Sequence, residues 1–330
     1  MDITTKTAIE NFLESVRLAR SKNTYETYSF ALQSFQTLLT HHKFALNTPV
    51  ASIPEDGISW FATYLKAHAP ATEQLYLQAV MGFYKYLAAE RLADLNLSRI
   101  DLLKQQRARR PGIRLPQFPV EDIERVLEFI SNSANLANLS GDDTGIVRLR
   151  EVRDRAFLLT LADTGLRVHE ACALRRGDID WNEGRAVVIG KGDKQAVVRF
   201  TTRSMRALKD YLALRASLDG GSGRPLPSLP LFARHDKGAG KKIKPITTTT
   251  GRNIVSERVK QILGDEAVGK ITPHSFRHYF VTTVLRGSGN LKLAQELARH
   301  SNIQVTQRYA HLSDDELDRG YYEIFEKKNK

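Results

Sequence analysis

Apolar residues in the first third of the chain recur with the period of an α-helix. The first helical face carries Ala8, Phe12, Val16 and Ala19. Residues 21–23 interrupt this pattern, and a second face then carries Tyr28, Leu32, Phe35, Leu38 and Leu39. Two more helices are predicted over residues 54–67 and 72–90. Residues 1–106 are therefore predicted to form a small helical bundle.

A basic stretch that contains several prolines follows this bundle. Its five basic residues occur without any acid and are Lys104, Arg107, Arg109, Arg110 and Arg114. Helix-breaking residues interrupt the same stretch at Pro111, Gly112, Pro116 and Pro119. We interpret residues 107–119 as a linker between two domains. Such a run is either a solvated segment or a contact to the phosphates of a polyanion.

Residues 120–330 predict a second domain that is mainly α-helical with a small β-sheet. A helix over residues 120–130 precedes a polar loop, and a helix that resumes near Leu149 ends at Gly165 in a left-handed cap. The β-rich runs at residues 185–190 and 196–200 flank a turn and predict a hairpin.

Helix signals dominate the last part of this domain. Thr272 and Pro273 predict the N-cap and the first residue of a helix that stops near Gly287. Asn290 is a candidate cap for a helix through Arg299. A short helix after residue 302 would then hold the tyrosine at position 309.

The composition narrows the class of protein and of its partner. The 330 residues are 42% hydrophobic, which suits packed cores, and the formal charge of +12 favours a polyanionic partner over a membrane. Charge alone fits nucleic-acid binding and a simple solubility role equally well. No apolar run is long enough to span a bilayer, and Cys172 is the only cysteine, so no intramolecular disulfide can form. Residues 1–6 show no leader pattern, and a cytoplasmic protein is predicted.

The candidate chemistry centres on Tyr309. A phenol is a weak nucleophile at neutral pH, so it needs neighbours that take its proton and stabilise charge on the group under attack. Such groups occur upstream: Arg167 lies in the sequence TGLRVHE, and His274 and Arg277 lie in the sequence TPHSFRH. Two guanidinium groups suit a phosphodiester, because they match its oxygens and stay charged at any working pH.

Each of these residues also has an ordinary structural interpretation. Arg167 and Glu170 are three residues apart on a helix and would form a surface ion pair. A tyrosine in a short helix is more often a core residue than a nucleophile. His274 and His278 have the spacing of a metal pair, although Ser275 stands where the zincin motif has glutamate. No metal site is predicted.

Four motifs in series carry a resemblance to a known family. They are T-G-L-R-x-x-E, G-K-G, H-x-x-R-H and a histidine with tyrosine nine positions later, between Thr164 and Tyr309. Their residues and order resemble the tyrosine recombinase or phage-type integrase family, and in particular its Xer-like site-specific recombinases. The resemblance implies a two-domain, C-shaped DNA clamp, with a helical, SAM-like core-binding domain at residues 1–106 and a mixed α/β catalytic domain at residues 120–330. It also implies strand exchange through a covalent 3′-phosphotyrosyl intermediate and a Holliday junction, for DNA integration, excision or replicon resolution.

The resemblance implies a role for each candidate residue. Tyr309 would be the nucleophile, and Lys191 the general acid for the leaving oxygen. Glu170 would be a supporting acid. Four groups would stabilise charge on the phosphate, and they are Arg167, His274, Arg277 and His300. His274 and His300 are both candidates for the base that takes the phenolic proton. The family pattern has glycine before the second of these histidines, where this chain has Arg299. No metal, nucleotide or other cofactor is implied, and the sequence contains no phosphate-loop motif.

The DNA-binding candidates are basic residues in the turn before the second helix, the linker, the hairpin turn and one loop. They are Lys22, Arg107, Arg109, Arg110, Arg114, Lys194, Lys241 and Lys242. A helix over residues 314–328 has an apolar face and packs either on its own subunit or, as the resemblance implies, on a neighbour. The implied assembly is a homo-tetramer, or two pairs of related recombinases, on double-stranded DNA, with accessory DNA-bending or translocase proteins.

Two other functions share parts of this pattern. A type IB topoisomerase or telomere resolvase uses the same chemistry in a different assembly. A catalytically silent DNA-binding regulator needs only the basic surface. The complete set of six catalytic residues favours the recombinase over the regulator.

Overall fold

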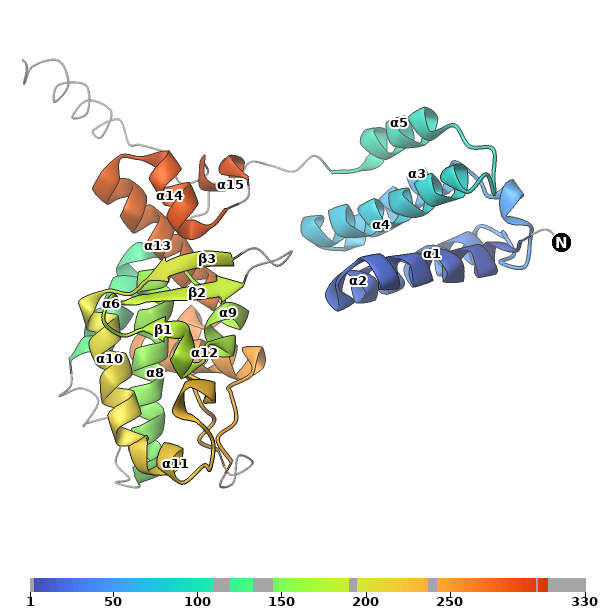
Figure 1. The fold of residues 1–330 in the computed structure, drawn as a ribbon. Helices are drawn as coiled ribbons and strands as arrows, with labels where there is room; N and C mark the ends of the chain where they lie inside the picture. The colour runs from blue at the N-terminus through green and yellow to red at the C-terminus, as the bar shows by residue number, and fades with distance from the viewer. Residues whose placement is uncertain are drawn as a thin grey trace, which may run out of the picture. The chain divides into compact units, whose positions relative to one another are not determined.

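Figure 1 shows a mostly helical chain with one small sheet. The computed structural model describes residues 3–109, 119–132, 145–189, 195–236, 242–300 and 302–307. The chain divides into two compact units, residues 1–114 and 115–330. The predicted mainly α fold with a small β-sheet is confirmed. The roles of the two units as DNA-binding and catalytic domains remain predictions.

Within residues 3–109, five α-helices build the N-terminal unit. They are α1 (Thr5–Ala19), α2 (Lys22–His41), α3 (Gly57–Tyr64), α4 (Pro70–Ala89) and α5 (Leu97–Arg107). The predicted break before α2 has a local cause, because the Ser21 hydroxyl accepts the backbone N–H of Thr24 at 3.3 Å and caps the helix. In the core, Phe35 packs edge-on against Phe61 and Tyr84.

A buried carboxylate fixes the residues that follow α5 to this unit. Glu73, in the first turn of α4, is buried and accepts the backbone N–H of Arg109 at 2.7 Å. The Arg109 guanidinium donates to the other Glu73 oxygen, and to the carbonyl of His68 at 2.5 Å. These contacts occupy the guanidinium of Arg109 inside the unit, and its contact with DNA stays a prediction. The charge of Arg109 is used inside the unit, where it anchors the start of the linker.

The second unit combines helices with an antiparallel sheet. Its described helices are α6 (Val120–Ser131), α8 (Gly145–Thr164), α9 (Val168–Ala173), α10 (Thr202–Leu214), α11 (Ala216–Gly220), α12 (Thr248–Leu263), α13 (Pro273–Ser288), α14 (Leu291–Ala298) and α15 (Ile303–Gln307). Its strands, in spatial order, are β1 (Ile179–Asp180), β2 (Arg185–Ile189) and β3 (Gln195–Arg199). The predicted hairpin is β2 and β3, in which Val187 pairs with Val197. Strand β1 was not predicted, because two residues are too few to show an alternating pattern.

Helix α8 is the centre of the second unit. Every residue from Ala156 to Thr164 is buried. Helices α10 and α13 pack along α8, and α6 and α9 also contact it. Helix α12 comes close at Gly251, where a Cβ atom would lie 2.9 Å from Cys172 Sγ and 3.0 Å from Phe157 Cζ. A helix enclosed in this way needs apolar residues on more than one face.

Helix α13 begins as predicted and ends later. Thr272 and Ser275 form a capping box at its start, and Pro273 is its first residue. Gly289, with φ +61°, takes the left-handed conformation that ends the helix. Gly287, where the sequence predicted the end, lies inside the helix.

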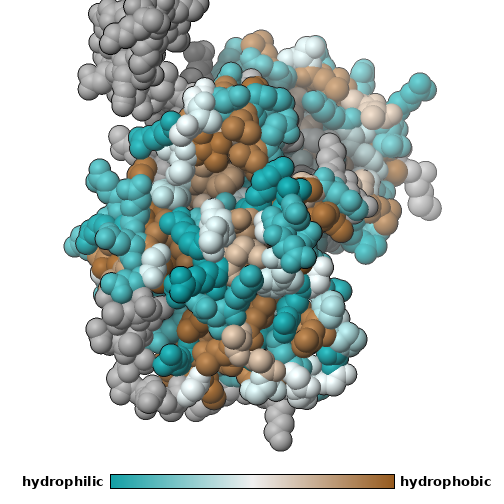
Figure 2. All heavy atoms as spheres, turned by 60° about the vertical axis from the view of Figure 1, so that its left-hand side comes forward, coloured by the Kyte–Doolittle hydropathy of each residue, from teal (hydrophilic) through white to brown (hydrophobic). Residues whose placement is uncertain are grey.

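The helices and the surface lack the features of a membrane-spanning protein in the part of the chain that is described. None of the helices in the described ranges is both long enough and apolar enough to cross a bilayer. On the face shown in Figure 2, apolar side chains gather in groups that polar side chains separate. This face therefore presents no single continuous apolar surface.

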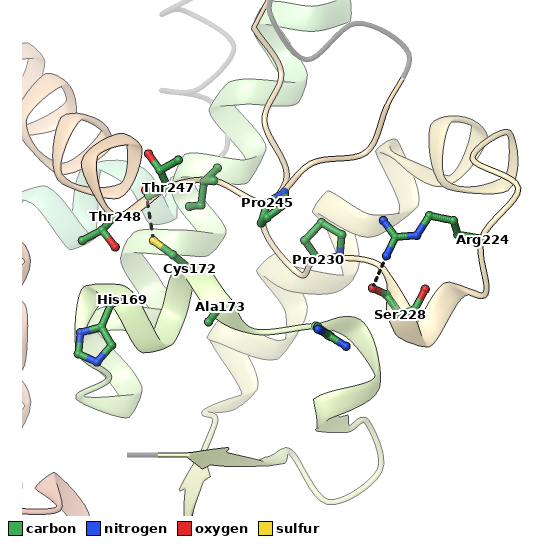
Figure 3. Close-up of a pocket in the computed structure, with 11 residues that line it drawn as sticks. His169, Cys172, Ala173, Arg224, Ser228, Pro230, Pro245, Thr247 and Thr248 are labelled. Carbon is green, nitrogen blue, oxygen red and sulfur yellow. Dashed lines mark hydrogen bonds between the residues drawn. The ribbon is translucent and has the colours of Figure 1, made fainter. Parts of the chain in front are cut away.

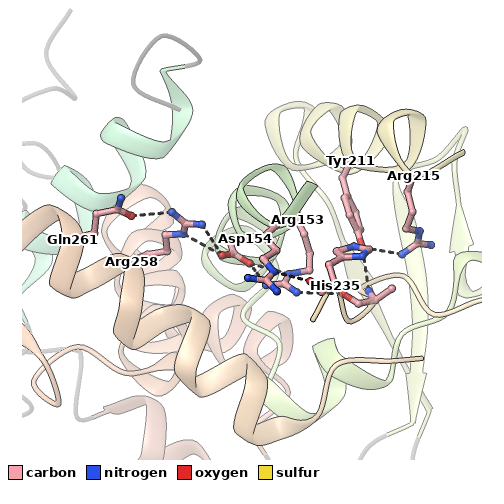
Figure 4. Close-up of polar contacts among 9 residues, drawn as sticks. Arg153, Asp154, Tyr211, Arg215, His235, Arg258 and Gln261 are labelled. Carbon is pink, nitrogen blue, oxygen red and sulfur yellow. Dashed lines mark hydrogen bonds and ion pairs between the residues drawn. The ribbon is translucent and has the colours of Figure 1, made fainter. Parts of the chain in front are cut away.

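A buried polar network joins α10 to the loop that contains His235 (Figure 4). The Tyr211 hydroxyl oxygen accepts the backbone N–H of Ala233 at 3.1 Å and an N–H of Arg215 at 3.0 Å. Its own hydrogen is left for Nε2 of His235, 2.7 Å away, which is therefore the unprotonated ring nitrogen. Burial, followed by the charges of nearby arginines, lowers the pKa of His235 to about 3.

We expect His235 to make the second unit less stable in acid. An unfolded histidine has a pKa of about 6.5, so below that pH the unfolded chain binds a proton that the folded chain excludes. The free energy of unfolding should fall as the pH drops from about 6.5 towards 3, by up to about 1.4 kcal/mol per pH unit. Urea denaturation between about pH 7 and pH 5 should show a shallower fall for His235→Asn.

The exposed His169 provides the matched control for this test. His169→Asn should keep the slope of the wild-type protein. If the His235→Asn and wild-type profiles ran parallel, His235 would not be the residue that titrates.

Candidate active site

Four of the six predicted catalytic residues are described, and they lie at the ends of three helices. Arg167 precedes α9, His274 and Arg277 lie in the first turns of α13, and His300 follows α14. The charges of Arg167 and Arg277 help to lower the pKa values of His274 and His300, and Arg277 donates to the carbonyls of Gly165 and Ala298, so the four residues lie in one cluster. Tyr309 and Lys191 lie outside the described residues.

A left-handed turn at Gly165 leads from α8 to the cluster. Gly165 has φ +60°, as predicted, and its N–H bonds to the Leu161 carbonyl at 3.2 Å. The Phe280 ring of α13 packs so closely that a Cβ atom at Gly165 would overlap it. Both the backbone conformation and the available space therefore require glycine.

Glu170 is the acidic centre of the cluster. It is buried and accepts the backbone N–H of Arg167 at 2.8 Å, Nη1 of Arg167 at 3.0 Å and Nη2 of Arg299 at 3.0 Å. Burial raises the pKa of Glu170, but the Arg167 N–H and the charges of Arg299 and Arg167 outweigh it, so the pKa lies below its ordinary value. Glu170 is therefore a carboxylate at neutral pH.

The pair formed by Glu170 and Arg167 differs from an ordinary surface ion pair. The Glu170 side chain is 2% exposed, whereas the Arg167 side chain is 42% exposed. The carboxylate is thus held inside the protein while the guanidinium reaches the surface. This arrangement fixes a cation where an anion can approach it from outside.

Arg277 is buried inside the cluster and is 2% exposed. Its two Nη groups donate to the carbonyls of Gly165 and Ala298, and so tie the turn after α8 to the end of α14. Burial, and then the charges of Arg167 and Arg299, lower the pKa of Arg277. A guanidinium still keeps its proton at neutral pH, and it has five N–H donors in all.

The turn between α14 and His300 contains an arginine in the left-handed conformation. Arg299 has φ +58° and ψ 45°. Its N–H bonds to the Glu296 carbonyl at 3.0 Å, and the N–H of His300 bonds to the Gln295 carbonyl at 3.1 Å. This is a Schellman motif, in which glycine usually takes the left-handed position. A side chain in that conformation costs about 1–2 kcal/mol.

The sequence alone did not identify Arg299 as a site residue. The signal was its position, since an arginine stands where the family pattern has glycine. Its contact with Glu170 links segments 129 residues apart, and no local pattern predicts such a contact.

The imidazoles of the cluster favour the neutral form. Desolvation, followed by the charges of neighbouring groups, lowers the pKa of both His300 and His278 to about 4 and also lowers the pKa of His274. Nδ1 of His300 lies 2.9 Å from Oγ1 of Thr306. Neutral imidazoles can accept a proton at neutral pH. In the part of the chain that is described, no three His, Cys, Asp or Glu side chains gather as a metal site would require.

A cavity of about 560 Å³ lies beside α9 (Figure 3). His169 and Cys172 of α9 line it together with Thr247 and Thr248 at the start of α12. Burial raises the pKa of the Cys172 thiol to about 12, so this thiol is not poised as a nucleophile. None of the four clustered site residues lines this cavity.

The predicted DNA-binding residues fall into three groups. Lys22, Arg107 and Lys242 are exposed, and Nζ of Lys22 also lies 3.8 Å from Glu26. Arg109 is bound inside the N-terminal unit. The residues outside the described ranges are Arg110, Arg114, Lys194 and Lys241. The predicted helix at 314–328 is also outside them.

Comparison with known proteins gives consistent matches. The model of the phage integrase family matches residues 124–316. Tyrosine recombinase XerC of Myxococcus xanthus is 31% identical over 263 residues, which cover 79% of this chain and 78% of the relative. Tyrosine recombinase XerC of Bacillus subtilis is 27% identical over 321 residues, which cover 96% and 95%.

Solved structures share the fold. The XerH site-specific recombinase, bound to a palindromic difH substrate in a post-cleavage complex, has a TM-score of 0.67 at 20% identity and covers 95% of this chain and 83% of that one. A lambda integrase dimer bound to a COC′ core site has a TM-score of 0.62 at 15% identity and covers 94% and 78%.

Gly165→Ala tests the two requirements at the turn before the cluster. We expect the free energy of unfolding to fall by about 1–2 kcal/mol from the left-handed conformation and by about 1–3 kcal/mol more from the overlap with Phe280. Gly223→Ala is the matched control, because Gly223 has φ +66° but a new Cβ atom there meets nothing within 4 Å. Chemical denaturation of both variants gives the comparison. Equal losses would mean that the Phe280 ring moves aside without cost.

Proposed function

The chain belongs to the phage integrase family and is a site-specific tyrosine recombinase, and from this premise we propose how its residues cleave and rejoin DNA. In the proposal, the Tyr309 oxygen attacks the scissile phosphate and forms a covalent bond to the 3′ end of the cleaved strand. The 5′ hydroxyl of a partner strand then reverses the step. The energy of the broken diester is kept in the phosphotyrosyl bond, so no ATP is needed.

The charge of the cluster is the observation that best supports this proposal. The guanidinium groups of Arg167 and Arg299 donate to one carboxylate, that of Glu170, and the guanidinium of Arg277 lies near it. The cluster itself therefore leaves two positive charges without a counter-charge. A phosphodiester carries one negative charge and gains a second as the tyrosine oxygen adds to phosphorus. The cluster thus matches the transition state better than the ground state, as catalysis requires.

The described imidazoles support the proton transfers. His274 and His300 both have lowered pKa values, so both imidazoles are neutral at neutral pH. Either can therefore take the proton of the phenol as Tyr309 attacks. Lys191, which stands between β2 and β3 in the sequence, is proposed to protonate the leaving 5′ oxygen. Glu170 is proposed to hold Arg167 in place. Arg277 contributes its charge from inside the protein.

We propose that double-stranded DNA is the partner and that the helical N-terminal unit and the second unit serve as core-binding and catalytic domains. XerH bound to difH and lambda integrase bound to a COC′ core site are DNA complexes of proteins with this fold, and they support the proposal. The proposed assembly is a homo-tetramer, or two pairs of related recombinases, joined through the helix at 314–328. The proposed location is the cytoplasm.

Strand exchange fits better than the two other functions considered for the sequence. The XerC relatives are named as recombinases, which argues against a type IB topoisomerase or a telomere resolvase. A silent DNA-binding regulator would have no need for a charged arginine cluster with neutral imidazoles beside it.

We expect Tyr309→Phe to abolish the covalent adduct and leave site binding unchanged, because it removes one oxygen and little packing surface. A nicked DNA substrate, which traps the adduct, provides the assay, and a gel-shift titration measures binding. Tyr279→Phe is the control, since Tyr279 lies on α13 two residues after Arg277 and is the other tyrosine near the site. Adduct formed by Tyr309→Phe but lost in Tyr279→Phe would move the nucleophile to Tyr279.

We expect Lys191→Ala to slow cleavage strongly on a normal substrate and much less on one with a 5′-thio leaving group, which departs without a proton. Single-turnover cleavage at saturating protein gives both rates. Lys194→Ala, three positions later in the sequence, should weaken binding without distinguishing the two substrates. Equal defects of Lys191→Ala on both substrates would assign Lys191 to phosphate binding instead.

A further inference from the structure

Arg299 has an unfavourable backbone conformation for an arginine. Only three non-glycine residues in the described ranges have a positive φ, namely Lys43, Arg91 and Arg299. The first two are exposed, whereas the Arg299 side chain is 11% exposed and points into the cluster. Glycine would form the same turn without strain. The turn alone therefore does not explain why position 299 carries an arginine.

The contacts of that side chain lead to the proposed phosphate site. Nη2 of Arg299 donates to Oε2 of Glu170 at 3.0 Å. The same oxygen accepts the backbone N–H of Arg167, and Oε1 accepts Nη1 of Arg167 at 3.0 Å. Glu170 thus lies between two guanidinium groups, one buried and one exposed. The buried guanidinium can fix the carboxylate that in turn fixes the exposed one.

A second set of contacts locks the same region. Nη2 of Arg299 lies 3.4 Å from the Gly165 carbonyl, to which Arg277 also donates. Arg277 donates as well to the carbonyl of Ala298, the residue before Arg299. The end of α14 and the turn after α8 are therefore held together by two arginines.

The cost to stability argues that this arrangement serves function. Besides its strained backbone, Arg299 has a buried Nε without a hydrogen-bond partner in the described part of the chain. Its charge also lies near those of Arg167 and Arg277, and each of these features opposes folding. Strained and poorly satisfied groups persist where a site requires them.

We propose that Arg299 is a positioning residue for DNA cleavage, which holds Glu170 and through it the guanidinium of Arg167 against the scissile phosphate. This inference rests on the proposed function. Arg299 does not itself contact the phosphate in this scheme. The backbone of Arg299 also positions His300 in the cluster, because His300 is the next residue of the same turn.

Arg299→Gly is the informative variant, because glycine keeps the left-handed turn and removes only the side chain. Single-turnover cleavage of a nicked substrate at saturating protein should slow on the order of 100-fold, as expected when a catalytic group loses its position. Binding of a half-site should stay unchanged. Arg91→Gly is the matched control, since it makes the same exchange at φ +56° on an exposed residue outside the site, and it should cleave at the wild-type rate.

A substrate with a neutral methylphosphonate at the scissile position separates positioning from a structural role. It lacks the charge that Arg167 neutralises, so the defects of Arg167→Ala and Arg299→Gly should both shrink on it. In the Glu170→Gln background, Arg299→Gly should add little further loss, because both changes break the same link. Arg299→Lys, which keeps the charge, should recover part of the rate.

Two results would overturn the inference. One is wild-type cleavage by Arg299→Gly, and the other is an equal defect of that variant on the phosphodiester and the methylphosphonate. If Arg299→Gly does not fold by circular dichroism, Arg299→Asn, which also tolerates the left-handed turn, takes its place in the same assays. Failure of the proposed function is a different outcome, in which the wild-type protein forms no adduct on either substrate.

Discussion

One buried carboxylate among three guanidinium groups is the interaction on which the site depends. Like charges at close range repel strongly in a poorly hydrated interior. Burial, and after it the charges of neighbouring arginines, lowers the pKa values of Arg277 and Arg299. Glu170 offsets it by accepting hydrogen bonds from two of the three arginines and from a backbone N–H. Without that carboxylate, the helix ends that carry the arginines would be pushed apart. The buried carboxylate of Glu170 therefore holds the site together.

The ends of helices, and not their bodies, supply the side chains of this site. Gly165 reverses the chain after α8, the Thr272 capping box starts α13, and the Schellman motif at Arg299 ends α14. Each end has a local cause that fixes its geometry. Because the long helices between these ends pack around α8, local turns are converted into a fixed arrangement of distant residues.

The features predicted from the sequence were those with local causes. The helical periods of the N-terminal unit, the break at residues 21–23, the left-handed Gly165 and the β2–β3 hairpin depend on residues close together in the chain. The predicted end of α13, at Gly287, was wrong. Both Gly287 and Gly289 lie near this end, and the sequence does not show at which of them the helical hydrogen bonds stop. The candidate site residues were predicted through motif resemblance, and their roles remain predictions. The pairings of Glu73 with Arg109 and of Glu170 with Arg299 could not be predicted, because they join segments that only tertiary packing brings together.

The enclosure of α8 limits how this chain can diverge over generations. Every residue from 156 to 164 of this helix is buried. A change in side-chain volume there must therefore be matched by a compensating change in a neighbouring helix. Such paired changes are rare, whereas exposed loops and outer helices change freely. Lineages that acquire new DNA targets are therefore expected to change residues on the surface while the sequence of the interior helix α8 hardly changes.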